Sequence, residues 1–323
     1  MSHPLLEVKH LWTGFILKHS ILTAVRDMSF TLRQGATLGI VGESGCGKSL
    51  TALSIMRLLP DNAAILKGEI KFEGNDISHI SEKAMCRIRG NKISMIYQDA
   101  LTSLNPVMTI GKQLCEPFII HQGMSMGNAR KQAMESLLEV GISSPRDRMR
   151  AYPHQLSGGQ RQRVMTAIAL ACMPKLLITD EPTTALDVTI QAQILLLFKR
   201  LQRLTGSAIM LITHDIGIIA EMSDDVLVMY AGEAVEYAEG DDIFRDPLHP
   251  YTLGLLQSIP HLSKRKERLK SIPGTVPDLY HMPEGCRFCE RCSEAQERCH
   301  REAPPVFTVK NGRQVRCWKF QNP

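Results

Sequence analysis

Residues 37–49 read TLGIVGESGCGKS, and positions 42–49 fit the pattern G-x-x-x-x-G-K-[S/T] without a departure. The glycines of this pattern let the backbone curl so that successive N–H groups face a phosphate. The motif requires a strand before it and a helix after it. The apolar run at 37–41 predicts the strand, and the periodicity of residues 51–59 predicts the helix. The sequence therefore predicts a loop that binds a nucleotide phosphate.

The side chains of this loop add a positive charge and a metal ligand. Lys48 places a point charge at the β- and γ-phosphate oxygens, and Ser49 offers its hydroxyl to Mg²⁺. The residues expected to surround the phosphates are Gly42, Glu43, Ser44, Gly45, Cys46, Gly47, Lys48 and Ser49.

Two carboxylates follow a second apolar strand, in the run LLITDE at residues 176–181. Asp180 is placed to hold Mg²⁺, directly or through water, as the acidic strand end does in P-loop ATPases. Glu181 is one residue further on and can orient or deprotonate the attacking water. A solvated acidic strand end is the alternative interpretation, and the presence of the phosphate loop argues against it.

A second glycine pair lies in the run LSGGQ at residues 156–160 and opens a predicted helix over residues 160–171. Its bare N–H groups lie at the positive end of that helix, where they can bind another phosphate. One chain cannot easily wrap both glycine segments around the same phosphate. Two chains that face each other head to tail are the simplest solution. This arrangement and the LSGGQ run resemble the ATP-binding cassette (ABC) family, and the resemblance covers about residues 5–240.

The resemblance implies ATP and Mg²⁺ as ligands and implies roles for further residues. Gln98 would reach the metal and the attacking water, and His214 would contact the γ-phosphate. Asp187 would touch the facing subunit. Phe15 would stack on adenine, with Trp12 as its rival for that role. The residues that would contact the ATP of the partner subunit are Ser157, Gly158, Gly159 and Gln160.

The order of patterns along the chain predicts an α/β fold. Polar and apolar residues alternate near the N-terminus, which predicts an antiparallel β subdomain. Strands and helices alternate over residues 160–213, which predicts a mainly parallel core sheet. Helical periodicity predicts a helical subdomain at about residues 100–155. We therefore expect a P-loop NTPase of the ABC cassette type over residues 1–250, followed by a small cysteine-rich C-terminal extension over residues 251–323.

The extension narrows the resemblance to one group of transporters. The runs DIF at residues 242–244 and HPYT at residues 249–252 resemble the tail of ATP-binding subunits of bacterial dipeptide/oligopeptide importers, and of related nickel and metallophore importers. The resemblance implies a chain peripheral to the cytoplasmic face of the inner membrane. It also implies a second, homologous ATPase in a heterodimer, two permease subunits and an extracytoplasmic solute-binding protein. Peptide is the expected cargo, and nickel or a metallophore complex is the alternative.

Five of the nine cysteines crowd into the last 38 residues, which favours metal over disulfide in a cytosolic chain. Sulfur ligands in this number suit Zn²⁺ or an iron–sulfur cluster. The family pattern places its four cysteines at Cys286, Cys292, Cys299 and Cys317, so Cys289 is extra. The resemblance implies a [4Fe–4S] cluster there. We therefore expect a cluster that staples the short tail, with zinc as the first alternative and unligated thiols as the second.

Composition excludes several other classes of protein. The chain has 323 residues and no apolar run of the ~18–20 residues that a membrane span needs, and its N-terminus lacks a signal-peptide pattern. The chain has a net charge of +5, and residues 261–323 carry +6 of it, with 13 Lys/Arg against 7 Asp/Glu, whereas the rest carries −1. A soluble ABC ATPase that acts on nucleic acid or ribosomes is therefore a remote alternative. Such proteins usually carry two cassettes or a coiled-coil insertion, and we expect no nucleic-acid partner here.

Overall fold

The computed structural model describes residues 4–98, 103–182, 188–258 and 271–321. The chain divides into two compact units, which are described separately. The first unit comprises Met1–Leu32, Thr37–Ser78 and Ile212–Pro323. The second unit comprises Arg33–Ala36 and His79–Leu211.

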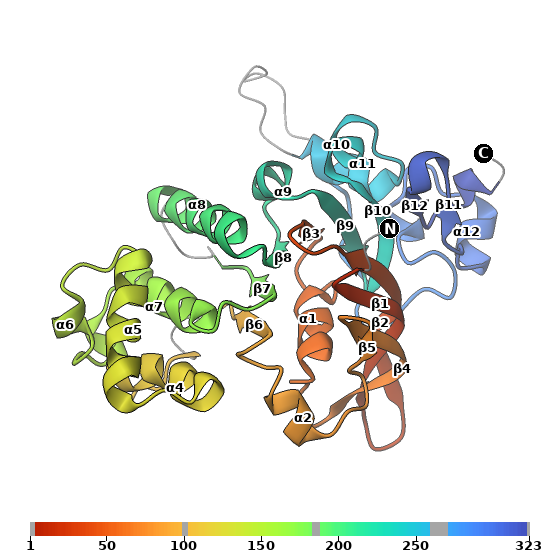
Figure 1. The fold of residues 1–323 in the computed structure, drawn as a ribbon. Coiled ribbons are helices and arrows are strands. Elements are labelled where there is room, and N and C mark those ends of the chain that lie inside the picture. Colours follow the sequence, from red (N-terminus) through yellow and green to blue (C-terminus); the bar gives the residue numbers. More distant parts are fainter. Residues whose placement is uncertain (1–3, 99–102, 183–187, 259–270, 322–323) are drawn as a thin grey trace. The chain divides into compact units, whose positions relative to one another are not determined.

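The first unit contains an antiparallel sheet with the strand order β2-β1-β4-β5. Its strands are β1 (Leu6–Ile16), β2 (Ile21–Leu32), β4 (Ala63–Phe72) and β5 (Asn75–Asp76). Leu6 lies opposite Leu32 on one side and Phe72 on the other, and all three side chains are buried. Alternation along these strands buries one face, as the sequence pattern predicted. The antiparallel β subdomain is therefore confirmed, and its strands lie side by side in Figure 1.

A second set of strands in this unit carries the phosphate loop. β3 (Thr37–Val41) runs parallel to β9 (Asp225–Tyr230), and every residue of both strands is buried. Such complete burial is typical of parallel strands covered on both faces. β10 (Glu233–Glu239) pairs antiparallel with β9.

The helix after the phosphate loop begins and ends earlier than the sequence indicated. α1 spans Lys48–Met56, whereas residues 51–59 were expected to be helical. The helix starts directly at the loop because Gly47 caps it with φ 96°. It ends because Arg57 adopts a left-handed conformation with φ 50°.

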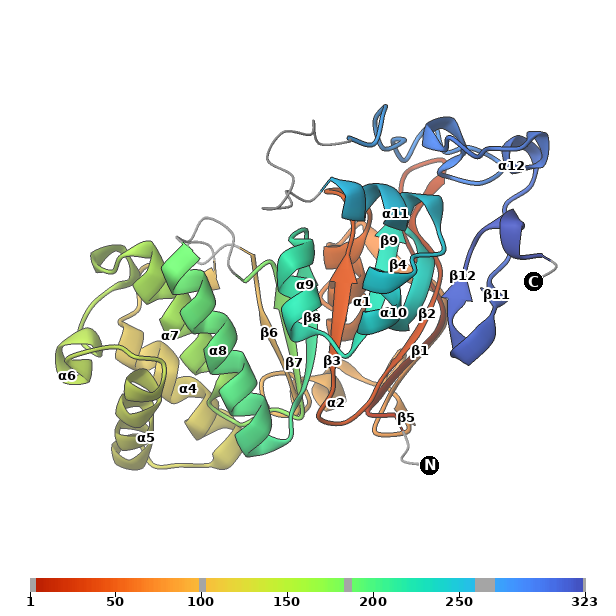
Figure 2. The same ribbon diagram turned by 90° about the horizontal axis from the view of Figure 1, so that it is seen from above.

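The second unit holds the helical subdomain and two parallel strands. β6 (Ile93–Ile96) pairs in parallel with β7 (Leu176–Asp180). Three helices contact one another, and Figure 2 shows them grouped: α4 (Ile110–Gln122), α5 (Met126–Glu139) and α7 (Gly158–Leu170). Shorter elements of this unit are α2 (Glu82–Cys86), α6 (Pro145–Arg148) and a 3-10 turn (Pro153–Gln155). α8 (Val188–Thr205) follows, and β8 (Ala208–Thr213) lies at the boundary of the two units.

The C-terminal extension consists of short elements in the first unit. They are α11 (Pro250–Gln257), a 3-10 turn (Cys289–Arg291), α12 (Glu297–Arg301), β11 (Phe307–Thr308), a 3-10 turn (Lys310–Gly312), β12 (Gln314–Val315) and a last turn (Trp318–Phe320). Two short helices precede the extension, α9 (Ile216–Met222) and α10 (Gly240–Arg245). β12 pairs antiparallel with β10 and so ties the extension to the strands of the same unit. None of the described helices is both long and apolar enough to cross a bilayer.

Buried arginines hold this extension in place, since it has few large apolar side chains of its own. Arg316 donates to Asp27 at 2.9 Å, and Arg313 donates to Glu236 at 3.3 Å. Burial alone would raise the pKa of Asp27, but hydrogen bonds from Arg316 and His10 outweigh it and lower that pKa. Glu236 is fully buried, so removing Arg313 should cost on the order of 3–5 kcal/mol, because the carboxylate is left uncompensated.

Candidate functional site

The phosphate loop has the curled backbone that its glycines predict. Gly45 and Gly47 have φ values of 78° and 96°, which side chains rarely tolerate. A Cβ atom added at Gly42 would lie 2.1 Å from the carbonyl oxygen of Met229, so only glycine fits there. The loop therefore follows β3 closely and leads directly into the N-terminus of α1, where backbone N–H groups favour an anion.

The side chain of Lys48 is held in this loop by two backbone carbonyl oxygens of the loop. The side chain is buried, and Nζ donates to the oxygens of Gly42 at 2.7 Å and Glu43 at 2.9 Å. The third contact of Nζ is to Cys46 Sγ at 3.8 Å, a weak acceptor that a phosphate oxygen can replace. The buried charge, the glycine loop and the helix N-terminus together suit a polyphosphate, and Ser49 follows Lys48 in the first turn of α1.

Cys46 lies inside the same loop and is fully buried. Burial raises the pKa of its thiol, although the nearby Lys48 lowers it in part. The carbonyl oxygen of Cys46 accepts a hydrogen bond from the Gly232 N–H at 2.9 Å. The turn between β9 and β10 therefore supports the loop from one side.

The C-terminal extension also contacts this loop, which the sequence did not indicate. The N–H of Glu43 donates to the hydroxyl of Tyr251 at 3.0 Å. The carboxylate of Glu43 accepts a hydrogen bond from Arg291 at 2.9 Å. Glu43 and Arg291 lie 248 positions apart, so no pattern of neighbouring residues could predict this contact. Only the HPYT run, which includes Tyr251, had been singled out, and for another reason.

The acidic pair of the second unit lies at the end of β7. Asp180 ends this strand and is buried, and Glu181 is buried as well. Glu181 adopts a left-handed conformation with φ 47°, which costs roughly 1–2 kcal/mol for a residue with a Cβ atom. Backbone strain of this kind clusters at functional sites.

Gln98 reaches the same carboxylate. Its Nε2 donates to Glu181 Oε2 at 2.9 Å, although the two residues lie 83 positions apart. Gln98 follows β6, the parallel neighbour of β7, so both residues lie just beyond the carboxyl ends of paired strands. The second unit therefore brings together two of the residues expected from the family resemblance.

The LSGGQ run forms the exposed start of α7. Ser157 caps the helix: its hydroxyl accepts from the Gln160 N–H at 3.3 Å, and Gln160 Oε1 accepts from the Ser157 N–H at 3.1 Å. Ser157 and Gly158 are exposed, and Gly159 is half-buried. The capping box leaves an accessible, positively polarised helix end. The helix begins at Gly158, two residues before the predicted start at residue 160.

The locations of the remaining predicted site residues, His214, Phe15 and Asp187, give less support to their expected roles. His214 is exposed directly after β8, and Phe15 is half-buried near the end of β1. Trp12, the rival of Phe15, lies between two cations, with Arg26 at 5.6 Å and Lys67 at 5.3 Å from its ring centroid. Asp187 lies outside the described residues.

The five C-terminal cysteines surround one small cavity of about 20 Å³. They are Cys286, Cys289, Cys292, Cys299 and Cys317, and none of them forms a disulfide. Burial raises the pKa of Cys286 to about 12. Within the described ranges, no group of three or more His, Cys, Asp or Glu side chains is arranged to hold a metal ion. The expected ligand arrangement is therefore not seen here, although the thiols converge on one place.

Two family models match the chain. The model described as "ABC transporter" matches residues 25–184, and the model described as "Oligopeptide/dipeptide transporter, C-terminal region" matches residues 235–299.

Curated relatives match over almost the whole chain. The chain is 50% identical to the "Oligopeptide transport ATP-binding protein AppD" of Bacillus subtilis, over 98% of this chain and 97% of that protein. It is 49% identical to the "Oligopeptide transport ATP-binding protein OppD" of Salmonella typhimurium, over 98% of this chain and 94% of that protein. The solved structure of a dimeric ATP-binding cassette, MJ0796, bound to ADP and Pi is 28% identical, with a TM-score of 0.66, over 72% of this chain and 98% of that one.

Proposed function

The chain belongs to the ABC transporter family as an ATP-binding subunit of a peptide importer, and from this premise we propose which residues carry out its ATPase cycle. Its family hydrolyses ATP, and its cassette fold is that of its structural neighbours. The observation that supports the proposal most strongly is the phosphate loop, in which a buried Lys48 is fixed by the carbonyl oxygens of Gly42 and Glu43.

We assign the binding of ATP and Mg²⁺ to two groups of residues. Residues 42–49 bind the phosphates, with Lys48 offsetting their charge, and Phe15 stacks on the adenine. Ser49, Gln98 and Asp180 would hold Mg²⁺, which would neutralise charge on the phosphate oxygens. The donors suit this ion, because Mg²⁺ prefers hydroxyl, amide and carboxylate oxygens.

We assign the activation of water to Glu181. Its carboxylate orients the water and accepts its proton as the oxygen attacks the γ-phosphate. The hydrogen bond from Gln98 at 2.9 Å holds this carboxylate in one orientation. His214 contacts the γ-phosphate and helps to fix the geometry of the transition state. The hydrogen bond between Gln98 and Glu181 supports this assignment most directly.

The exposed start of α7 is proposed to act on another chain. Ser157, Gly158, Gly159 and Gln160 contact the ATP of a homologous second ATPase, and Asp187 contributes to the same subunit contact. The capping box supports this role, since it orders the helix end while Ser157 stays exposed. The complete assembly also contains two permease subunits and an extracytoplasmic solute-binding protein. The chain is peripheral to the cytoplasmic face of the inner membrane.

The isolated chain should hydrolyse ATP slowly, because the signature of its partner is missing from its ATP site. We expect the rate per chain to rise by about tenfold or more when the second ATPase and the permeases are present. The measurement is phosphate release by the purified chain and by the detergent-solubilised assembly. An isolated chain as fast as the assembly would overturn the proposed division of the site between two chains.

Peptide is the cargo that the relatives support, since their names refer to oligopeptide transport. Nickel import and action on nucleic acid remain alternatives that no described feature favours. In the proposed assembly this chain does not recognise the cargo. The solute-binding protein and the permeases contact the cargo and select it.

For the C-terminal extension, residues 251–323, we propose a [4Fe–4S] cluster held by Cys286, Cys292, Cys299 and Cys317, with Zn²⁺ as the alternative. The convergence of five thiols on one cavity supports this, and thiolates are the ligands that both groups require. Such a group would order a segment with little apolar core of its own. Cys289 is the fifth thiol and is not a ligand in this assignment.

The cluster can be tested by the colour and content of the protein. The anaerobically purified chain should be brown and contain about four iron and four sulfide per chain. Cys292→Ser should lose most of the iron, whereas the matched variant Cys289→Ser should keep it. A colourless protein with stoichiometric zinc would reject the cluster in favour of the alternative metal.

A further inference from the structure

We propose that two residues of the C-terminal extension, Arg291 and Tyr251, are positioning residues for the phosphate loop. Both contact Glu43, the second residue of that loop, and the proposal rests on the ATP site assigned above. The extension would then be part of the ATP site and not only an appendage of the cassette.

Tyr251 holds the loop through a backbone hydrogen bond. Its side chain is fully buried, and its hydroxyl accepts the Glu43 N–H at 3.0 Å. The rings of Tyr230 and Phe288 contact its ring, with centroids 4.7 and 5.4 Å away, and so fix its position. Burial raises the pKa of Tyr251, which keeps this group a neutral hydroxyl. The first turn of the loop is therefore attached to an aromatic cluster.

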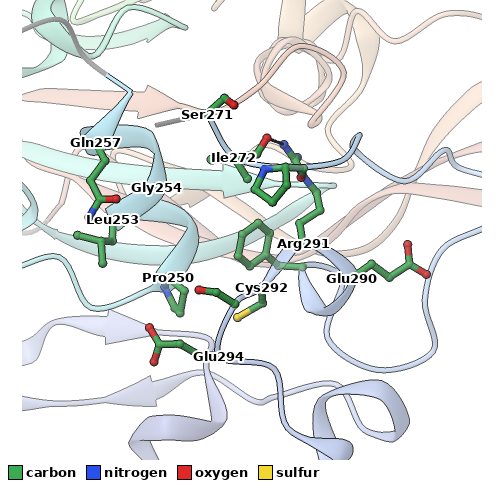
Figure 3. Close-up of a pocket in the computed structure, with 13 residues that line it drawn as sticks. Pro250, Leu253, Gly254, Gln257, Ser271, Ile272, Glu290, Arg291, Cys292 and Glu294 are labelled. Atoms are coloured by element: carbon green, nitrogen blue, oxygen red, sulfur yellow. Dashed lines mark hydrogen bonds between the residues drawn. The ribbon is translucent and has the colours of Figure 1, made fainter. Parts of the chain in front are cut away.

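Arg291 holds the loop through the carboxylate of Glu43. The Arg291 side chain is only 6% exposed, and its Nη1 donates to Glu43 Oε2 at 2.9 Å. Its Nε donates to the carbonyl oxygen of Pro273 at 2.8 Å. Figure 3 shows this side chain running from the cysteine-rich turn toward Ile272, along the wall of a cavity of about 340 Å³. Contacts on both ends of the guanidinium leave it little freedom.

A neighbouring arginine supports the loop at a second point. Arg287 donates to the carbonyl oxygen of Ala231 and is buried. The next residue, Gly232, donates its N–H to the carbonyl oxygen of Cys46 at 2.9 Å. Arg287 and Arg291 therefore flank Cys289 in the sequence and reach the loop at two places, one directly and one through the β9–β10 turn.

The pairing has an electrostatic consequence for ATP. Glu43 places a negative charge in a loop whose task is to bind phosphates, and its side chain is about 29% exposed. Arg291 offsets that charge and turns the carboxylate toward the extension. Without Arg291, an uncompensated carboxylate would repel the nucleotide, and the loop would lose one of its supports.

The test is the Kd for ATP with Mg²⁺ of the full-length chain, measured in a Glu181→Gln background so that turnover does not interfere. Arg291→Ala should raise Kd by about tenfold, which corresponds to 1.4 kcal/mol. Arg291→Lys should restore part of the affinity, because it keeps the charge but lacks the planar fork. Tyr251→Phe removes one hydroxyl and should raise Kd by several-fold.

Arg316→Ala is the matched control. Arg316 is an equally buried arginine of the extension, but it pairs with Asp27 and not with the phosphate loop. This variant should lower the melting temperature and leave Kd within about twofold. The effect of Arg291→Ala should also shrink in a Glu43→Gln background, since the two residues are coupled through one ion pair.

The outcomes separate this inference from the ATP site itself. An unchanged Kd in Arg291→Ala and in Tyr251→Phe would overturn the positioning role. Equal increases in Kd for Arg291→Ala and Arg316→Ala would overturn it too, because they would indicate general destabilisation. If Arg291→Ala does not fold, the Kd values of Arg291→Lys and Tyr251→Phe test the positioning role in its place. Undiminished ATP binding by Lys48→Ala would instead contradict the proposed site.

Discussion

Replacing Glu181 by Gln should lower ATP turnover of the assembled transporter by about 10²–10⁴-fold while ATP still binds. The amide keeps the size of the side chain and can retain the contact to Gln98, which lies 2.9 Å from Oε2 in the native chain. It cannot accept a proton from water at neutral pH. The loss therefore falls on the chemical step and leaves Lys48 and the phosphate loop intact. Phosphate release and nucleotide binding, measured on the same preparation, separate the two effects.

A milder variant checks that the effect belongs to the carboxylate. Gln98→Ala removes a hydrogen bond to Glu181 and one of the proposed Mg²⁺ ligands but leaves the base in place, so we expect a decrease of roughly tenfold at saturating Mg²⁺. A Glu181→Gln protein with near-normal turnover would remove Glu181 from its assigned role. Equal losses in both variants would indicate that positioning, and not proton transfer, dominates.

Local patterns predicted the parts of the chain where local physics decides the structure. β3 has the bounds that its apolar run indicated, because a strand buried on both faces needs a continuous apolar segment. The capping box at Ser157 and Gln160 could be anticipated in the same way, since its partners lie three residues apart. The predicted end of α1 was wrong, because the helix ends at Arg57, where no glycine or proline in the sequence marks the end.

Contacts between distant segments could not be predicted from the chain alone. The hydrogen bond from Gln98 to Glu181 depends on β6 and β7 being neighbours, and the pairing of Arg291 with Glu43 joins residues 248 positions apart. A solvated arginine and a buried one look the same in a sequence. The cysteine spacing predicted that the thiols would converge, but the described side chains do not form a metal site. The role of Asp187 stays a prediction.

ATP-driven peptide accumulation should depend almost entirely on the hydrolytic residues of this chain. An importer whose second ATPase hydrolyses normally still needs both sites to open and close together, so a block at Glu181 stops the cycle. We expect uptake to fall by about 100-fold or more with Glu181→Gln. Lys48→Ala should have an effect of the same size for a different reason, because it removes the charge that binds the phosphates.

The most direct test uses proteoliposomes that contain this chain, its second ATPase and the two permeases, with the solute-binding protein outside and ATP enclosed. A labelled peptide should accumulate inside only when ATP is enclosed, and the Glu181→Gln assembly should fail to accumulate it. Nickel supplied in place of peptide should not accumulate. Accumulation of nickel without peptide, or peptide uptake by the Glu181→Gln assembly equal to that of the native one, would contradict an ATP-hydrolysing peptide importer subunit.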